Sequence, residues 1–441
     1  MIGTVFNFLF VLNAHAANHF VRQGATGSGN GNDWSNAYTS LPATLARGDT
    51  YYIAAGSYPG RTFNTPTGGT AVITIKKAIE SDHGTGTGWL SGYGTGQATF
   101  NGMLEFTSSY WVIDGQTGGG AANNWNQNFG FKIIETRDAN ALIRIAYPNN
   151  KADYITVKHV DMQGKGSAAA SGGSYSNDGM AIYGASNITL SYYHMRGIGR
   201  CPFFGSPKNS IFEHGWVESY FGSSAVHSEI ASLAAYNQNI GDTTFRYSLF
   251  TDIQSTGGLM WNNYSDPTAH LYVYGNVFYK PAGAVWGAAN GLIGGWSTST
   301  NNMAANIWVY NNTFININQQ SLSSFPTVYS GNIASNNIFY NSDSPNFSRF
   351  ATHDYNHFIN SGGTQSEPHG TSATSGVPFV NFVGLDFRLT AHTTTGTSLS
   401  SPFNIDPLGT VRGSNGAFDR GAFQFISNTA LLMPPTNLRS M

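Results

Sequence analysis

The sequence predicts an all-β solenoid, a parallel β-helix, and the main observation is a pair of apolar residues that returns along the chain. Four mostly polar or small residues separate the two members of each pair, and the pair occurs seven times between residues 151 and 341. The first members are 22 to 36 residues apart, as expected for strands of constant length joined by loops of variable length. The pairs are Val157/Met162, Leu190/Met195, Phe212/Val217, Phe245/Phe250, Val273/Phe278, Val309/Phe314 and Ala334/Phe339.

Composition supports the same fold class. The 441 residues include 53 Gly, and only 10% of them are charged. Turns and stacked strands use such residues, whereas helical bundles do not. Each coil of a solenoid contacts only its neighbours, so one long domain over residues 17–426 is expected despite the length. The net charge of −2 provides no basic stripe, which argues against a nucleic-acid partner.

The repeat also fixes a register. Most of the pairs lie in β-rich segments without a helical stripe, so side chains should alternate between core and surface. Val273 is then expected to face the core and Tyr274 the outside. Three residues after the first apolar member, the last three units carry Asn276, Asn312 and Asn337. Stacked coils would align these amides into a hydrogen-bonded ladder.

The start of the chain reads as a targeting segment. Residues 1–16 contain an apolar run from Val5 to Leu12 and a small-residue site ending at Ala16, although a positive n-region is missing. This pattern predicts a signal peptide, and hence a secreted, cell-surface or periplasmic protein. No later apolar run approaches the ~20 residues that cross a bilayer. Residues 427–441 read as a tail, and the single Cys201 provides no intrachain disulfide framework.

Two terminal stretches resemble a known group. A strand at Phe20 is followed by a Gly-rich loop, a segment around Trp34 and the run Gly48-Asp49-Thr50-Tyr51. The run from Gly416 to Phe425 resembles a closing strand, although Gln424 stands where an acidic residue is frequent. With the repeats between them, these stretches resemble secreted bacterial right-handed β-helix proteins of the pectate-lyase-like superfamily.

The resemblance implies a right-handed parallel β-helix and an N-terminal helical cap, which we expect from Trp34 to Leu45 as a plug for the open end. It does not select the chemistry, because the superfamily includes polysaccharide lyases, glycoside hydrolases, epimerases, esterases and adhesins. Several of its lyases hold calcium through scattered Asp, Asn and backbone oxygens, so calcium stays open as a cofactor, and we assign no metal ligands.

The candidate catalytic residues are Asp178, Arg200, His227 and Glu229, which occupy neighbouring coils. With coils about 4.8 Å apart, they would share one patch. In β-elimination, Arg200 would neutralise a uronate carboxylate, His227 would take the C5 proton, and Glu229 or Asp178 would orient the base. The alternative is structural: Arg200 pairs with Asp178, and His227 is a packed histidine that orients Glu229.

A second set is predicted to bind substrate. Lys158, Glu213 and Arg246 follow the first apolar residue of their units, but the same row is also compatible with an exposed charge ladder of little consequence. Trp261 joins them, because tryptophan faces suit sugar rings, although many tryptophans are core residues. A Gly/Asn-rich loop from Gln116 to Asn128 should help to build the binding face. Tryptophans at expected loops or outer strands are Trp89, Trp125, Trp216, Trp261, Trp286, Trp296 and Trp308.

These residues favour a monomeric protein that acts on a polysaccharide. The first hypothesis is a lyase that cleaves a uronate-containing glycan by β-elimination. A non-catalytic glycan-binding or adhesive protein is an alternative, and Asp161 and Asp252 are further catalytic candidates. The other alternative is a glycoside hydrolase that uses two of Asp178, Glu213, Glu218 and Glu229.

Overall fold

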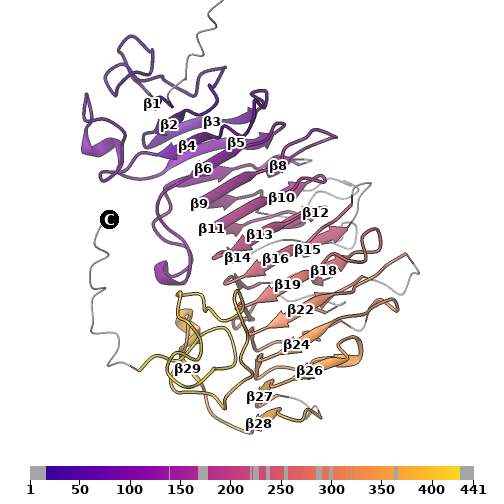
Figure 1. The fold of residues 1–441 in the computed structure, drawn as a ribbon. Coiled ribbons are helices and arrows are strands. Elements are labelled where there is room, and N and C mark those ends of the chain that lie inside the picture. Colours follow the sequence, from indigo (N-terminus) through magenta and orange to yellow (C-terminus); the bar gives the residue numbers. More distant parts are fainter. Residues whose placement is uncertain are drawn as a thin grey trace, which may run out of the picture.

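Parallel strand pairing runs through almost the whole chain (Figure 1). The computed structural model describes residues 16–138, 140–166, 177–218, 221, 228–234, 239–252, 257–284, 291–296, 301–318, 320–323, 325–361 and 366–427. Within these residues, 28 strands form one continuous parallel sheet, and β29 (Phe379–Asn381) and β30 (Asp386–Leu389) form a separate antiparallel pair. Each strand pairs with the equivalent strand of the next coil, so the prediction of a parallel β-helix is confirmed.

The strands stack into three faces, and each coil passes through them in the order A, B, C. Face A consists of β1 (Asn18–Val21), β2 (Thr50–Ile53), β4 (Ile73–Lys77), β6 (Trp111–Asp114), the first halves of β9 (Ile155–Gln163) and β11 (Ile188–Arg196), β13 (Ser210–Glu213), β16 (Thr243–Arg246), β19 (Leu271–Tyr274), β22 (Ile307–Tyr310), β24 (Ile333–Ser335) and β26 (Thr352–Asp354).

The other two faces follow along each coil. Face B consists of the first halves of β3 (Gly56–Phe63) and β5 (Ala98–Phe106), β7 (Phe131–Ile134), the second halves of β9 and β11, β14 (Trp216–Val217), β17 (Leu249–Phe250), β20 (Val277–Tyr279), β23 (Thr313–Ile315), β25 (Ile338–Tyr340), β27 (His357–Ile359) and β28 (Thr371–Ala373). Face C consists of the second halves of β3 and β5, β8 (Ala141–Ile145), β10 (Asp178–Ile182), β12 (Phe203–Gly205), β15 (Glu229–Ala234), β18 (Gly257–Asn262) and β21 (Ile293–Gly294).

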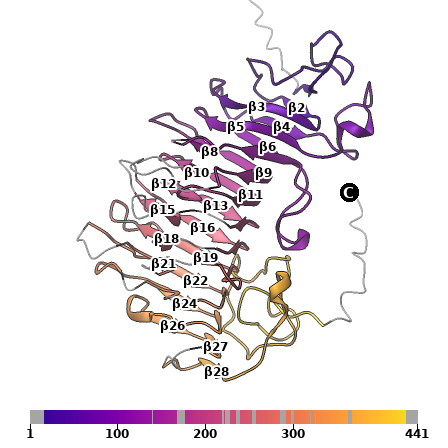
Figure 2. The same cartoon turned by 180° about the vertical axis from the view of Figure 1, so that it is seen from behind.

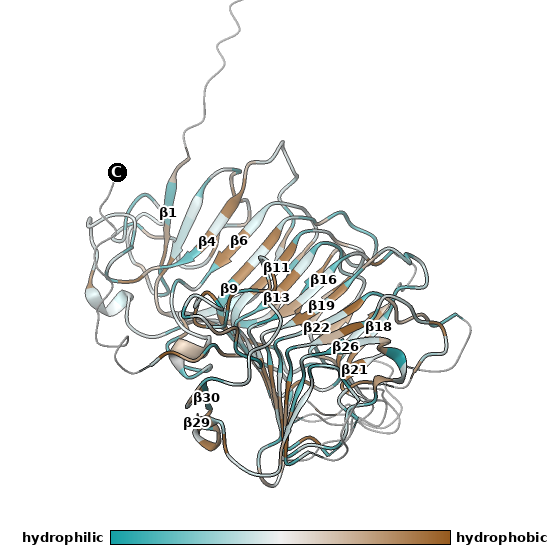
Figure 3. Ribbon diagram, turned by 60° about the horizontal axis from the view of Figure 1, so that its bottom comes forward, coloured by the Kyte–Doolittle hydropathy of each residue, from teal (hydrophilic) through white to brown (hydrophobic). Residues whose placement is uncertain are grey.

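The predicted register is confirmed. All seven apolar pairs are buried in one core cluster, and their members stack on one another from coil to coil. Val273, for example, lies between Phe245 and Val309 and has no exposed surface. Figure 3 shows the hydrophobic positions running across successive strands from β6 to β22.

The amide ladder is also present. The Asn276 backbone N–H and side-chain N–H groups donate to Asn312 Oδ1 at 3.0 and 3.1 Å, and Asn312 donates in the same way to Asn337. Asn337 in turn donates to Asn356, which extends the ladder by one coil. These bonds satisfy side-chain amides that have lost contact with water.

A second stack marks the corner between faces A and B. The rings of His159, Tyr192 and His214 lie 4.7 Å apart, with Tyr247 5.1 Å further on. All four residues have φ between 52° and 58°, in the left-handed region. This conformation turns the chain from one face to the next while it keeps the side chains aligned on the outside.

The N-terminal end is closed without the predicted helix. The only helical turns in the described part of the chain are the 3-10 turns η1 (Ser91–Tyr93), η2 (Ala121–Asn123), η3 (Phe347–Arg349) and η4 (Phe382–Gly384). Around Trp34, the Asp33 carboxylate accepts hydrogen bonds from the backbone and side chain of Asn36, which holds the chain in a turn. Such local bonds compete with a helix. Trp34 still acts as a plug, since it is buried against Phe20 and Trp89.

The C-terminal residues 379–425, which we call the closing segment, fold back over the outside of the last coils (Figures 1 and 2). On face B they cover an apolar row that includes Val277 and Ile338. On face A, Phe403 lies 4.9 Å from Tyr274, which is only 2% exposed. Tyr274 therefore points outward, as the register predicts, but is not at the surface.

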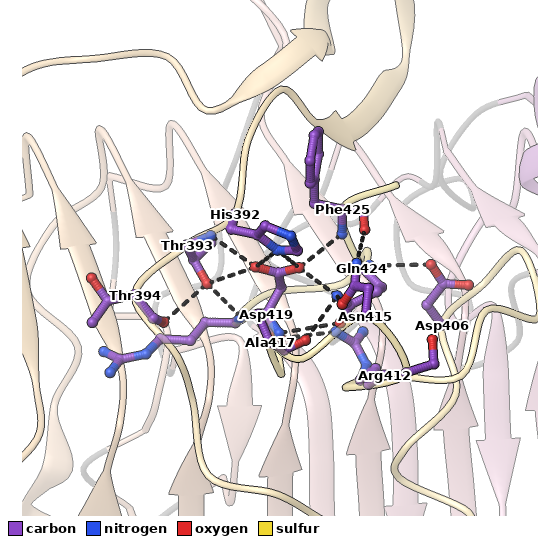
Figure 4. Close-up of polar contacts among 12 residues, drawn as sticks. His392, Thr393, Thr394, Asp406, Arg412, Asn415, Ala417, Asp419, Gln424 and Phe425 are labelled. Carbon is purple, nitrogen blue, oxygen red and sulfur yellow. Dashed lines mark hydrogen bonds and ion pairs between the residues drawn. The ribbon is translucent and has the colours of Figure 1, made fainter. Parts of the chain in front are cut away.

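The run from Gly416 to Phe425 is not a strand, which corrects the expectation from the resemblance. Its centre is the buried carboxylate of Asp419, which accepts hydrogen bonds from Thr393 N, Gln424 Nε2 and Phe425 N at 2.6 to 3.0 Å (Figure 4). Side-chain to backbone bonds of this kind hold an irregular segment in place of strand pairing. The described residues contain no helix with the length and apolar character needed to cross a membrane.

Candidate active site

A cavity of about 720 Å³ lies on the outer side of face B in the N-terminal half of the solenoid. A pocket of this size suits a small molecule or a short stretch of a polymer. Its lining contains both glycine-rich loops and ionisable side chains. The lining residues are Lys77, Ile79, Gly94, Gly96, Gln97, Thr117, Asn126, Asn128, Phe129, Gly130, Asp161, His194, Arg196 and Glu218.

Asp161 and His194 line this cavity and belong to a row of outward-facing residues on consecutive strands, in which Lys132 stands beside the cavity. Lys132 on β7, Asp161 on β9 and His194 on β11 are direct neighbours in the parallel register. Their sequence neighbours Met162 and Met195 point inward and are buried, because side chains alternate along a strand. The register that builds the core therefore also gathers these ionisable groups.

His194 occupies the centre of the row. Its Nε2 lies 2.8 Å from Glu218 Oε1, and its Nδ1 lies 3.2 Å from Asp161 Oδ1. His194 is 4% exposed, and its ring packs on Trp216 with centroids 4.9 Å apart. Burial disfavours the charged imidazolium, but the hydrogen bonds to Asp161 and Glu218 outweigh it and raise the pKa of His194.

Arg196 is the cation most open to the cavity, with 29% of its side chain exposed. Both terminal nitrogens bond the Asp161 carboxylate, and Nη2 also lies 3.3 Å from Gln163 Oε1. Lys132 approaches the same carboxylate at 3.8 Å. Burial works against the charged form of Asp161, but the bonds from His194 and Arg196 lower its pKa. Asp161 therefore holds a cation at the cavity surface.

Lys77 provides a second kind of cation at the cavity edge. Its side chain is completely buried, and Nζ lies 3.3 and 3.2 Å from the carbonyl oxygens of Tyr93 and Gly94. Burial lowers the pKa of Lys77 to about 8. An amine in this range gives up its proton in mildly alkaline solution.

One wall of the cavity is the loop over residues 115–130, which we call the strap. It lies on the corner stack: His159 Nδ1 is 2.8 Å from Gly118 O, and a Cβ at Gly120 would lie 3.1 Å from the Tyr192 ring. Figure 1 shows the strap leaving β6 and reaching toward the part of the closing segment that carries β29. There Trp125 is buried, and its indole N–H donates to Leu385 O at 3.4 Å. Because the strap lines the cavity, its position agrees with the expectation that this loop helps to build a binding face.

The predicted catalytic residues lie elsewhere. The buried carboxylate of Asp178 pairs with the half-buried Arg200 at face C, with Arg200 Nε 2.8 Å from Asp178 Oδ1. Cys201 Sγ lies 3.6 Å from the buried Glu229 carboxylate. The structure thus brings Asp178, Arg200 and Glu229 together, but none of them lines the cavity on face B. His227 lies outside the described residues. Burial and mutual pairing favour the structural alternative for these charges.

The predicted substrate-binding residues also lie away from this cavity. Lys158 lies 3.1 Å from Asp114, and Arg246 pairs with Glu213 at 2.6 Å on face A. These pairs are what the alternative of a charge ladder predicts. Trp261 is fully buried, and its indole N–H donates to Ala305 O, so it offers no face to a sugar. These outward charges stay predictions for binding, whereas burial contradicts a surface role for Trp261.

Sequence reasoning missed His194, Arg196, Lys132 and Lys77, although it named Asp161 and Glu218 as further candidates. The signal was present in the same repeat. Asp161 and His194 precede the second apolar member of their units, and Arg196 and Glu218 follow it. The predicted charges Lys158, Glu213 and Arg246 follow the first apolar member, which lies on face A, whereas the second member lies on face B.

The residues offer no clear calcium site. Among the described residues, no group of three or more His, Cys, Asp or Glu side chains is arranged to hold a metal ion. Asp161 and Glu218 lie on opposite sides of the His194 ring and bond to it. We therefore derive no step through calcium.

No protein-family model and no curated protein sequence matches the chain. Similar solved structures include the pectate lyase Pel9A, with a TM-score of 0.48, 15% identity and coverage of 93% of this chain and 98% of that one. A rhamnogalacturonan lyase has a TM-score of 0.41, 11% identity and coverage of 73% and 87%. An alginate lyase from Paenibacillus has a TM-score of 0.35, 13% identity and coverage of 75% and 92%. The assignment of the chain as a parallel β-helix rests on its own strand pairing.

Proposed function

We propose that this protein is a polysaccharide lyase that cleaves a uronate-containing glycan by β-elimination in the cavity on face B. The supporting observation is the combination of a titratable histidine with an excess of positive charge in one open site. Three cations stand at or beside the cavity against two carboxylates: Lys77, Lys132 and Arg196 against Asp161 and Glu218. Such a site attracts an acidic sugar.

In this reaction the C5–H bond and the C4–O4 bond of a uronate break, and a C4=C5 double bond forms. One proton moves overall from C5 to the leaving oxygen. Arg196, held by Asp161, is the residue proposed to neutralise the uronate carboxylate, which would make the C5 proton more acidic. An exposed guanidinium that is already oriented by a carboxylate loses little freedom when a second carboxylate binds.

His194 is the proposed base. Of its two carboxylate partners, Glu218 is the more exposed, with 26% of its side chain accessible against 10% for Asp161. Nε2, which bonds Glu218, is therefore the nitrogen that a sugar can approach once it displaces the Glu218 carboxylate. The raised pKa makes neutral His194 a stronger proton acceptor than a free histidine. Activity should rise with pH through this raised pKa, because only the neutral ring accepts the proton.

This proposal carries the roles expected for Arg200, His227 and an acidic partner over to a different set of residues. All of the groups come from one chain, so the proposal requires no second subunit. Glycans of this class lie outside cells, so a secreted or cell-surface location is part of the proposal and agrees with the export signal predicted for residues 1–16.

The test is an assay of the purified protein on pectate, alginate and glycosaminoglycans. A lyase produces an unsaturated sugar that absorbs near ~235 nm, and substitution of the base should lower the rate by about 10²-fold or more. His194→Gln should therefore lose activity, whereas His369→Gln, at an exposed histidine paired with Asp354, should not. Reducing ends without absorbance would identify a hydrolase, and binding without any product would identify a glycan-binding protein. Either result would overturn the proposal.

A further inference from the structure

A second cavity, of about 480 Å³, lies on the opposite edge of face A from the strap. It is built by the turns that precede four successive face A strands, β11, β13, β16 and β19. The turns stack through backbone bonds, such as Ser210 N to Asp242 O and Thr243 N to His270 O. The lining residues are Ser186, Lys208, Asn209, Asn239, Ile240, Gly241, Asp242, Asp266, Thr268, Ala269, His270 and Tyr272.

Aromatic rings form one side of this cavity. The His270 and Tyr272 rings are parallel, with centroids 5.4 Å apart, and Trp308 meets both rings edge-on at 5.2 and 5.4 Å. All three rings are half-buried, so each keeps part of its surface in contact with solvent. Partly exposed rings beside polar groups suit the apolar faces of sugar rings.

Hydrogen-bonding groups form the other side. The Asp242 side chain is 46% exposed and already accepts the His270 backbone N–H at 2.9 Å, which fixes its position. Asp266 Oδ1 accepts a hydrogen bond from Thr268 Oγ1 at 2.7 Å. Its second oxygen, Oδ2, accepts no hydrogen bond described for this part of the chain, so it can bond a ligand. The Lys208 ammonium forms no ion pair with any of the described residues. Carboxylates and an amine together bind hydroxyl groups, which both donate and accept.

The charge of this cavity differs from that of the face B cavity. Here two carboxylates, Asp242 and Asp266, face one lysine, Lys208, and the His270 Nδ1 that lies 3.4 Å from Asp242 Oδ1. This balance disfavours a uronate or a phosphate, because an anion would be repelled by the carboxylates. The ligand class that fits the aromatic rings and the carboxylates is an uncharged sugar.

We propose that this cavity is a second glycan-binding site that holds an uncharged pyranose residue, separate from the cleavage site. The apolar face of the sugar lies on Tyr272 and His270, and its hydroxyl groups bond Asp242 and Asp266. The site anchors neutral sugars of a polysaccharide without cleaving them. It does not depend on the lyase proposal, since it shares no residue with the face B cavity.

Native affinity gels cast with neutral galactomannan, xyloglucan or galactan, and with polygalacturonate as the acidic comparison, test this site. The protein should be retarded by at least one neutral glycan, and Tyr272→Ala and Asp242→Asn should each weaken that binding by about tenfold, the loss of one good contact. Tyr264→Ala should bind like the unmodified protein, because Tyr264 is exposed but lies outside the cavity. Asp242→Asn keeps the shape of the side chain, so it remains informative if Tyr272→Ala fails to fold.

His194→Gln separates the two proposals, because it should abolish cleavage while the neutral gel still retards it. If the protein binds neutral glycans but releases no unsaturated product, the lyase proposal is wrong and the proposal of this second site stands. Three results would overturn the site: no retardation by any neutral glycan, equal retardation of Tyr272→Ala and the unmodified protein, or retardation by polygalacturonate alone that depends on Tyr272.

Discussion

The two halves of face B have the same backbone but different surroundings. In the N-terminal half, the outward row reads Lys132, Asp161 and His194 and opens into a cavity. In the C-terminal half, the same row continues with Leu249 and Val277 and is buried beneath the closing segment. The comparison shows that the sheet places outward side chains at equivalent positions in every coil. Where these side chains are polar the row lines a cavity, and where they are apolar the closing segment covers it.

The physical reason is the cost of removing water. Burying an apolar row gains about 25 cal/mol per Å² of apolar surface, so the closing segment is held by the side chains that it covers. A charged row would lose its hydration under the same cover. In the open half, Asp161 and Arg196 instead pair with each other, and 29% of the Arg196 side chain stays exposed.

Trp216 stands at the boundary between the halves. Its ring packs on His194, its indole N–H donates to Thr251 Oγ1 at 2.9 Å, and its side chain belongs to the apolar cluster of the covered half. The strap joins the halves a second time through Trp125. The closing segment thus helps to shape the site although it contributes no residue to the cavity lining.

The largest effect should come from a charge placed in the covered half. Val277→Asp would bury a carboxylate under the closing segment and should lower the free energy of unfolding by about 4 kcal/mol or more. Thr99→Asp, at the equivalent outward position next to Lys132 in the open half, should change it by less than ~0.5 kcal/mol. Chemical denaturation followed by circular dichroism measures both. Equal losses would mean that the closing segment does not cover this row.

Asn312→Ala should have the next largest effect. It would leave the Asn276 backbone N–H and the Val273 carbonyl without partners in the core, at a cost of about 2 kcal/mol. Cleavage per folded molecule should not change, since Asn312 lies in the covered half. Asn341→Gly is the control, because Asn341 belongs to an exposed amide row and has φ of 47°, which glycine adopts freely. A loss of activity in folded Asn312→Ala would contradict the separation of the halves.

Trp125→Ala tests the link through the strap. Without this anchor the strap should no longer hold one wall of the cavity, so KM should rise roughly tenfold while the melting temperature changes little. Limited proteolysis should cut the strap faster in this variant than in Tyr264→Ala. If kinetics and proteolysis both stay unchanged, the strap does not depend on Trp125.

The smallest effects concern pH. The pKa of His194 is raised in the folded protein, so its stabilising contribution is complete below pH 6.5 and is lost as the pH rises through the raised value. Burial lowers the pKa of His214, under the strap, to about 4, so stability falls as the pH drops from 6.5 toward 4.

These two histidines therefore respond to pH with opposite signs. His194→Gln should cost more stability at pH 5.5 than at pH 9, and His214→Asn should improve the relative stability in acid. Denaturation midpoints measured from pH 4 to pH 9 cover both effects. Identical pH profiles for the two variants would contradict the proposed environments.

Most of the fold could be predicted from the sequence, but little of the candidate site could. The apolar pairs and the asparagine ladder are set by neighbouring coils, so their spacing along the chain reveals them. The burial of Tyr274 and the anchoring of Trp125 depend on the closing segment, which is far away in sequence. The missing helix near Trp34 reflects local bonds between Asp33 and Asn36 that outweigh the helical spacing of apolar residues.

The candidate site was missed for a related reason. Searching for acids and bases that share a coil position found Asp178 and Arg200, which do lie together. Alignment alone does not separate a buried ion pair from a reactive group, because that difference depends on exposure to a cavity. His194 occupies an equally regular position, but the cavity above it is bounded by two loops that carry no repeat, the strap and the loop from Ile79 to Gln97.

The most direct test of the account compares Arg196→Ala with Arg200→Ala in cleavage per folded molecule. Arg196→Ala should fold normally and lose about 10²-fold or more of the rate of forming unsaturated product. Arg200→Ala should lose stability by about 3 kcal/mol, since it leaves Asp178 buried without its partner, and should keep its activity. The double variant Asp178→Asn/Arg200→Met removes both charges if the single variant does not fold. Loss of activity at Arg200 with full activity at Arg196 would contradict the assignment of the site to face B.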